Sequence, residues 1–165
     1  MSQSSRTVTV LARLACLAGV FAALPASGAA AAVTVPSGFS VSTFAGPPTG
    51  RIQPDDITWF GGHVYVAFQN GVGPDGAPSS TGSTQSTLVE YDSAGHPINS
   101  WDLTGKADGM AGDPAHDRVI VTANEDQHSR LYTVDPDAAP GSQVTAYTYS
   151  PDPGASGTGG VHTGG

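Results

Sequence analysis

The chain has 165 residues and a formal net charge of −8, from fourteen acidic residues and six Lys or Arg, with a single cysteine. A chain this acidic repels phosphate backbones and anionic membrane surfaces, so nucleic acids and such membranes are excluded as partners. One cysteine cannot form a disulfide within the chain.

The first 32 residues differ in character from everything after them. Arg6 and Arg13 precede an apolar run from Leu14 to Leu24, which small residues follow. This pattern predicts a cleavable secretory signal peptide over residues 1–32. The apolar run is too short for a membrane anchor, which needs ~20 residues. A lipoprotein signal needs an aliphatic residue three positions before its cysteine, where Cys16 has Arg13.

Cleavage after Ala32, or after Ala30 as the alternative, removes Cys16 and yields a secreted protein without thiols. Disulfides, thiol catalysis and thiolate metal sites are therefore excluded from the mature chain. Four basic residues then remain against fourteen acidic ones, a formal charge of −10. The mature chain is expected to have no membrane attachment.

After the signal peptide the residue pattern is typical of an all-β protein. No apolar periodicity of 3.6 residues is sustained, and β-branched and aromatic residues form short runs separated by Gly, Pro, Asn and Asp. The first four strands are predicted at residues 57–60, 64–68, 87–91 and 98–103. Four more are predicted at 109–111, 119–122, 130–134 and 143–149.

The second group of strands repeats the first. Ser86–Asp92 is echoed by Ser129–Asp135, and each follows a β-branched strand; the offset is 55 residues in the second strands and 43 in the third. A repeat of four antiparallel strands at this period predicts a β-propeller. A β-sandwich is the alternative, but it does not predict that one strand order recurs with matching residues. Residues 33–150 are thus expected to form two blades of a partial propeller.

Both ends of the repeat suggest an incomplete ring. Phe39–Phe44 resembles a lone fourth strand that would close the last blade, and 151–165 is a glycine-rich connection to an absent third blade or a disordered tail. Propellers have about four to eight blades, and two blades alone would leave large apolar faces bare. The chain is therefore expected to be a truncated copy of a longer propeller, with a ring assembled from several short chains as the alternative.

Antiparallel strand order places two sets of loops on one face: the D-to-A loops, from the fourth strand of one blade to the first of the next, and the B-to-C loops, between second and third strands. Acidic and amide side chains gather there, and these oxygens could bind calcium or attract a cationic ligand. The alternative is that Asp and Asn bond to nearby backbone in loops. The metal candidates are Asp56, Asn70, Asp108, Asn124 and Glu125.

Other motifs yield no catalytic residue. Gly71–Gly76 matches a dinucleotide fingerprint, but Pro74 and Pro78 forbid the helix that such a site needs, so it is predicted to be a surface loop. The five histidines lack zinc-ligand spacing. The chain has no G-x-S-x-G nucleophile elbow.

Pro54–Ile57 with its following hairpin, and Leu88–Gly95 leading to Trp101, resemble secreted bacterial propellers of the NHL-repeat kind and the related lactonase and gluconolactonase-like superfamily. The resemblance implies a six-bladed ring, and in lactonase-like members a catalytic calcium ion held by Asn, Asp and Glu at the channel mouth. Two functions follow as expectations. The first is a secreted module that binds a ligand or partner on the D-to-A/B-to-C loop face without catalysis of its own. The second is part of a calcium-dependent lactonase-like hydrolase.

Overall fold

The computed structural model describes residues 33–149, so the predicted signal peptide and glycine-rich end lie outside the described residues. The chain divides into two units, residues 1–41 and 42–165. The described part of the first unit, residues 33–41, has no helix or strand. Among the described residues, no helix is long and apolar enough to cross a membrane.

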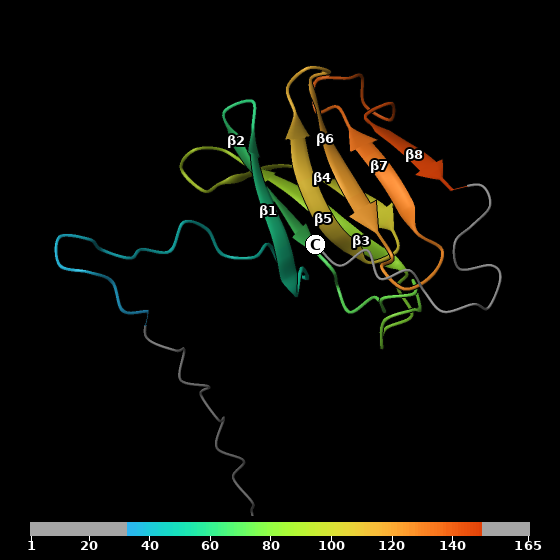
Figure 1. The fold of residues 1–165 in the computed structure, drawn as a ribbon, viewed down its shortest axis with the longest axis horizontal. Coiled ribbons are helices and arrows are strands. Elements are labelled where there is room, and N and C mark those ends of the chain that lie inside the picture. The colour runs from blue at the N-terminus through green and yellow to red at the C-terminus, as the bar shows by residue number, and fades with distance from the viewer. Residues whose placement is uncertain (1–32, 150–165) are drawn as a thin grey trace, which may run out of the picture. The chain divides into compact units, whose positions relative to one another are not determined.

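The second unit holds eight strands, and no helix occurs in its described part (Figure 1). Sheet A contains β1 (Pro54–Phe60), β2 (His63–Phe68), β3 (Gln85–Tyr91) and β4 (Pro97–Thr104). Sheet B contains β5 (Ala107–Asp113), β6 (Arg118–Ala123), β7 (Arg130–Val134) and β8 (Val144–Thr148). In each sheet the strands pair antiparallel in chain order, and neither sheet closes on itself. The predicted all-β class and the eight strands are confirmed.

The first hairpins of the two sheets are stabilised in different ways. Gly61 and Gly62 join β1 to β2 with φ of 60° and 88°. Two successive positive φ values are what a tight two-residue hairpin requires, and glycine adopts them without a Cβ clash. The β5–β6 hairpin is longer and is held by Asp113, whose carboxylate accepts a hydrogen bond from Arg118 Nε at 3.0 Å and lies 2.8 Å from His116 Nδ1.

The strand registers show that sheet B repeats sheet A. Each first strand has an irregularity, between Pro54 and Ile57 in sheet A and between Ala107 and Met110 in sheet B. The row of partners that follows it is Ile57, Val66 and Val89 in one sheet, and Met110, Val121 and Tyr132 in the other. Val66 and Val121 are 55 residues apart and Val89 and Tyr132 are 43 apart, so the predicted repeat and its two offsets are confirmed.

The two sheets enclose one core. Sheet A contributes Tyr65, Ala67, Leu88, Trp101 and Leu103, and sheet B contributes Val119, Val121, Ala123, Tyr132 and Val134. The equivalents of Val119 and Val121 in sheet A are Val64 and Val66, which lie on its other face with Val89 and Tyr91. Sheet B therefore packs on sheet A through the face that is equivalent to the open face of sheet A. This is stacking of successive repeats, in contrast to a sandwich whose equivalent faces meet.

The predicted strand at Phe39–Phe44 is wrong, because these residues have no regular secondary structure. A strand needs a hydrogen-bonded partner, and no described strand pairs with this segment. Its downstream end instead covers part of the open face of sheet A. Ala45 packs against Phe68, Val89 and Tyr91, and the Phe44 ring meets the Tyr91 ring edge-on at 6.3 Å.

Candidate functional site

The loop-face pocket, of about 190 Å³, lies between the start of β5, the β6–β7 loop and the end of β8. Its lining is Asp108, Thr122, Ala123, Asn124, Glu125, Ser129, Arg130 and Tyr149. Three of the five predicted metal candidates thus come together, namely Asp108, Asn124 and Glu125. Asp56 acts electrostatically on Asp108 from β1. Asn70 does not line this pocket.

The two predicted asparagines hold backbone in place. Asn70 and Asn124 both have positive φ, 55° and 62°. The N–H of Asn124 donates to Lys106 O at 2.9 Å, and its Oδ1 accepts from Lys106 N at 2.9 Å. Asn70 makes the same pair of bonds with Ile52, at 3.1 and 3.3 Å. These bonds match the predicted alternative, in which loop amides serve the nearby backbone.

Asn124 also fixes the approach of two loops. A Cβ on Gly105, whose φ is 101°, would lie 2.5 Å from Asn124 Oδ1, and one on Gly76 would lie 2.9 Å from its Nδ2. Glycine is therefore required where the β4–β5 loop crosses the asparagine side chain. Asn124 is buried and its Nδ2 donates to His128 O at 3.1 Å. The wall of the pocket is thus built by packing and by backbone hydrogen bonds.

Asp56 connects the two sheets. Its carboxylate accepts from Met110 N at 2.5 Å and from the following Ile57 N at 2.7 Å. The first bond runs from β1 to β5, the strands along which the sheets lie side by side (Figure 1). Both carboxylate oxygens therefore have backbone partners in this arrangement.

Two charged groups at the pocket, Asp108 and Lys106, have raised pKa values. Burial raises the pKa of Asp108, the charge of Glu125 raises it further, and Lys106 opposes both. Lys106 Nζ lies 2.5 Å from Glu125 Oε1. Burial lowers the pKa of Lys106, but the hydrogen bond and charge of Glu125, together with the charges of Asp108 and Asp55, outweigh burial, so that pKa is raised. The Lys106–Glu125 ion pair thus lies at the edge of the pocket, near a carboxylate whose pKa is raised.

This arrangement suits a polar ligand better than a bare metal ion. Within residues 33–149, no group of three or more His, Cys, Asp or Glu side chains has a geometry that could hold a metal. Calcium takes 6 to 8 oxygen ligands, whereas Asn124 Oδ1 is bonded to backbone and Glu125 to Lys106. The pocket offers carboxylate, hydroxyl and guanidinium groups to a ligand.

The loop over 71–76 is a turn-rich surface segment with no helix, as predicted. Gly76 N donates to Gly73 O, and Gly73 N donates to Ala77 O, both at 2.9 Å. Together with Arg51 and Asp102, the surrounding β2–β3 loop lines a polar pocket of about 330 Å³ that contains Asn70.

A buried carboxylate was missed at the sequence level. Glu90 is 2% exposed, and its carboxylate accepts from Tyr65 Oη at 2.8 Å and from Asn99 Nδ2 at 2.7 Å. His63 Nδ1 lies 2.5 Å from it, so this histidine has a buried partner besides its position in the turn. Burial raises the pKa of Tyr65, and the hydrogen bond to Glu90 raises it further. The sequence indicates this buried carboxylate by a single acidic residue between two apolar residues of a predicted strand, Val89 and Tyr91.

No family model, curated protein or solved structure matches the chain. The resemblance to NHL-repeat and lactonase-like propellers therefore remains a prediction.

Proposed function

We propose that this protein is a secreted β-propeller module that binds a ligand or protein partner on the D-to-A/B-to-C loop face, without catalysis of its own. Further blades would complete the ring. The observation that supports the propeller is the stacking of two equivalent sheets through opposite faces. A further sheet can pack on this pair in the same way, whereas a sandwich in which two equivalent faces meet leaves no such face for a third sheet.

The ligand site proposed is the loop-face pocket, and the ligand class is a small polar group that carries a positive charge. Asp108 and Glu125 supply the negative oxygens; Lys106 balances Glu125, and Arg130 adds a second positive charge to the lining, so the cationic group is placed beside Asp108. A cationic group beside Asp108 would favour its ionised form, which burial and Glu125 disfavour. Ligand binding would thus offset the electrostatic cost of ionising Asp108.

Titration with agmatine, a small molecule with an amine and a guanidinium, tests the site. Amide chemical shifts of the mature protein (residues 33–165 after the predicted cleavage) should move at Asp108, Glu125 and Ser129. Asp108→Asn should weaken that response at least several-fold, while the matched change Asp75→Asn in another loop should not. Shifts that are absent, or equal in both variants, would overturn the assignment.

The alternative is part of a calcium-dependent lactonase-like hydrolase. One observation favours it: the charges of Glu125, Asp55 and Asp56 all act on Asp108, so four carboxylates lie near one another. Calcium would then raise the melting temperature, and lactone hydrolysis would disappear on addition of a chelator. A melting temperature unchanged by calcium, together with no hydrolysis, would rule out this alternative.

A further inference from the structure

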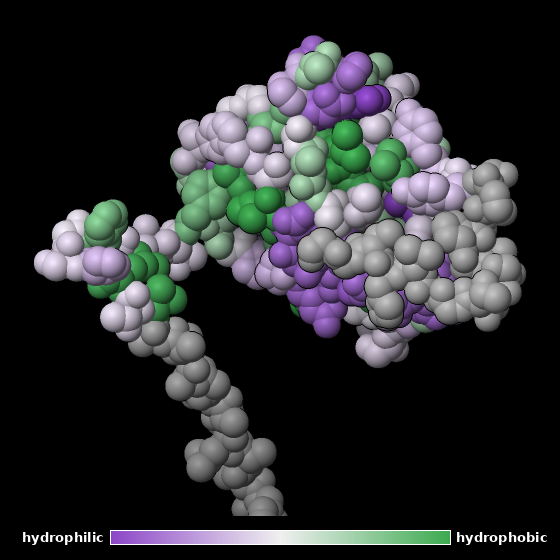
Figure 2. All heavy atoms as spheres, viewed as in Figure 1, coloured by the Kyte–Doolittle hydropathy of each residue, from purple (hydrophilic) through white to green (hydrophobic). Residues whose placement is uncertain are grey.

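Sheet A carries an apolar face that is only partly covered. On β1, Ile57 and Trp59 are 62% and 61% exposed, and beside them on β2 Val64 and Val66 are half-buried. These four residues share one face because Ile57 pairs with Val66 and Trp59 with Val64. Hydrophobic side chains reach the surface over β1 (Figure 2). Contiguous exposed apolar residues of this kind mark interaction surfaces.

Two of these four positions are fully buried in the second repeat. Val119 and Val121, the equivalents of Val64 and Val66, are 0% exposed because sheet A covers them. Sheet B thus shows that this face becomes buried when a sheet of the same fold packs against it. The open face of sheet A has the features of a surface that receives another sheet.

Sheet B presents the complementary surface. The residues through which sheet A covers sheet B include Tyr65, Leu88 and Trp101. By register their equivalents are Ile120, Leu131 and Tyr147, on the face of sheet B that no described sheet covers. Ile120 and Leu131 are half-buried and Tyr147 is 45% exposed. One copy of the chain therefore carries both halves of the interface that joins its own sheets.

The side chains at the two open faces differ from those in the existing interface. In the existing interface Gly112 lies so close to β1 that an added Cβ would be 3.1 Å from Phe60 Cβ and 3.2 Å from Trp59 O. At the open faces Trp59 replaces Gly112, Asp113 replaces Phe60 and Ile120 replaces Tyr65. Because Asp113 has a Cβ and the backbone remains, the contact between two copies must be wider at β1 than the existing interface in order to admit the indole.

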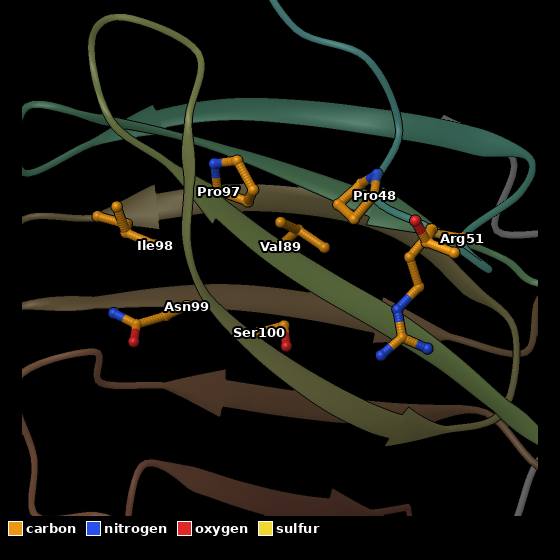
Figure 3. A pocket seen from close by; sticks show the side chains of 8 residues that line it. Pro48, Arg51, Val89, Pro97, Ile98, Asn99 and Ser100 are labelled. Atoms are coloured by element: carbon orange, nitrogen blue, oxygen red, sulfur yellow. The ribbon is translucent and has the colours of Figure 1, made fainter.

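The outer half of the face is covered by the chain itself. Residues 44–51 run over Val89 and Tyr91, and Arg51 Nη2 lies 3.5 Å from Asp102 Oδ1. Figure 3 shows Pro48 and Arg51 facing Val89 across a cleft of about 410 Å³ that also involves Pro97–Ser100 of β4. Ala45 also packs against the cluster that contains Phe68, so a docking sheet would contact mainly β1 and the half-buried Val64 and Val66 of β2.

We propose that the open face of sheet A binds the open face of sheet B from a second copy of this chain, in a head-to-tail contact. The contact joins different surfaces, so each dimer keeps one free face of each kind and can add copies until a ring closes. Copies of this chain would then supply the further blades. The inference rests on the proposed propeller packing and is independent of the ligand pocket.

Two variants separate this contact from any other. The mass of the mature protein in solution, from light scattering or sedimentation, should exceed that of a monomer and be a whole multiple of it. Trp59→Glu disables the face of sheet A and Ile120→Glu that of sheet B, so each alone should be monomeric. An equimolar mixture should form a dimer of twice the monomer mass, because each variant keeps the face that the other lacks. Ser93→Glu, in the exposed β3–β4 turn, is the matched control and should assemble normally.

Circular dichroism would check that each variant is folded. If Trp59→Glu is not folded, Ile57→Glu takes its place, and if Ile120→Glu is not folded, Leu131→Glu takes its place. A wild-type protein that is monomeric at every concentration overturns the proposal. So does an Ile120→Glu protein that assembles like the wild type, which would indicate a symmetric contact between two A sheets. A folded mixture that stays monomeric overturns it as well. A monomer that still responds to agmatine would refute the assembly while leaving the proposed pocket intact.

Discussion

At the scale of single residues, polar side chains in this protein mostly serve the fold. Asn70 and Asn124 were candidates for a metal site, and in the structure each closes a loop on the backbone of the preceding connection. Residue type and position were predictable, because Asn tolerates positive φ and bonds to nearby amides. The environment of Glu90 was not predictable, because its three partners come from β2 and β4, the strands on either side of its own strand.

Glu90→Gln should destabilise the protein. The substitution replaces one carboxylate oxygen by an amide group that donates, so a donor to Glu90 loses its acceptor and the buried amide group needs an acceptor of its own. Such a loss costs about 1 to 3 kcal/mol. Urea unfolding should show a lower midpoint with an unchanged slope. Glu125→Gln, at a half-exposed position paired with Lys106, serves as the control and should change the midpoint much less.

Asp108→Asn should stabilise the protein near neutral pH. Burial and Glu125 raise the pKa of Asp108 in the folded state. The folded protein therefore holds this proton to a higher pH than the unfolded chain does, and stability falls as pH rises from the ordinary aspartate pKa to the raised one. The amide removes that penalty. Melting temperatures measured across pH should differ most at neutral pH and converge in acid; a gap that persists in acid would contradict this origin.

At the scale of elements, strands and hairpins follow from local sequence. β2 is a continuous apolar run after His63, β3 is rich in β-branched and apolar residues from Thr87 to Tyr91, and the glycine pair between β1 and β2 marks the tight turn. The segment Phe39–Phe44 has an equally strand-like pattern and forms no strand. Its pattern is local, whereas a strand also needs a partner edge, which the described sheets do not provide.

Gly62→Ala should weaken the first hairpin. Gly62 has φ of 88°, a conformation that costs an L-residue about 1 to 2 kcal/mol. Nothing lies within 4 Å of the added Cβ, so backbone strain is the only new cost. Gly46→Ala is the matched control, since that glycine has open space and no positive φ. Equal melting temperatures for the two variants would contradict the strain argument.

At the scale of the whole molecule, net charge and apolar faces act against each other. The apolar faces of sheets A and B would favour the proposed association between copies, while the negative net charge of the chain would oppose it through repulsion. Screening shortens the range of that repulsion to about 8 Å at physiological salt.

Assembly should therefore increase with ionic strength. The average mass of the mature protein should rise when sodium chloride is added, because screening reduces repulsion while leaving the apolar contact intact. Sedimentation of Trp59→Glu over the same salt range provides the control and should remain at the monomer mass. An average mass that falls with added salt would indicate that ion pairs, and not the apolar faces, hold the copies together.

The sequence by itself determined the all-β class, the positions of eight strands and their repetition, because alternation, β-branched runs and turn glycines are local properties of the chain. It also indicated that acidic loops would share one face, since antiparallel order dictates which loops are neighbours. Only the tertiary structure decided which face of each sheet is packed, that Asp108 and Glu125 share a pocket while Asn70 lies elsewhere, and that residues 44–51 cover half of an open face. Those outcomes depend on contacts between residues far apart in the chain, where the fit of side chains and the partners available decide the result.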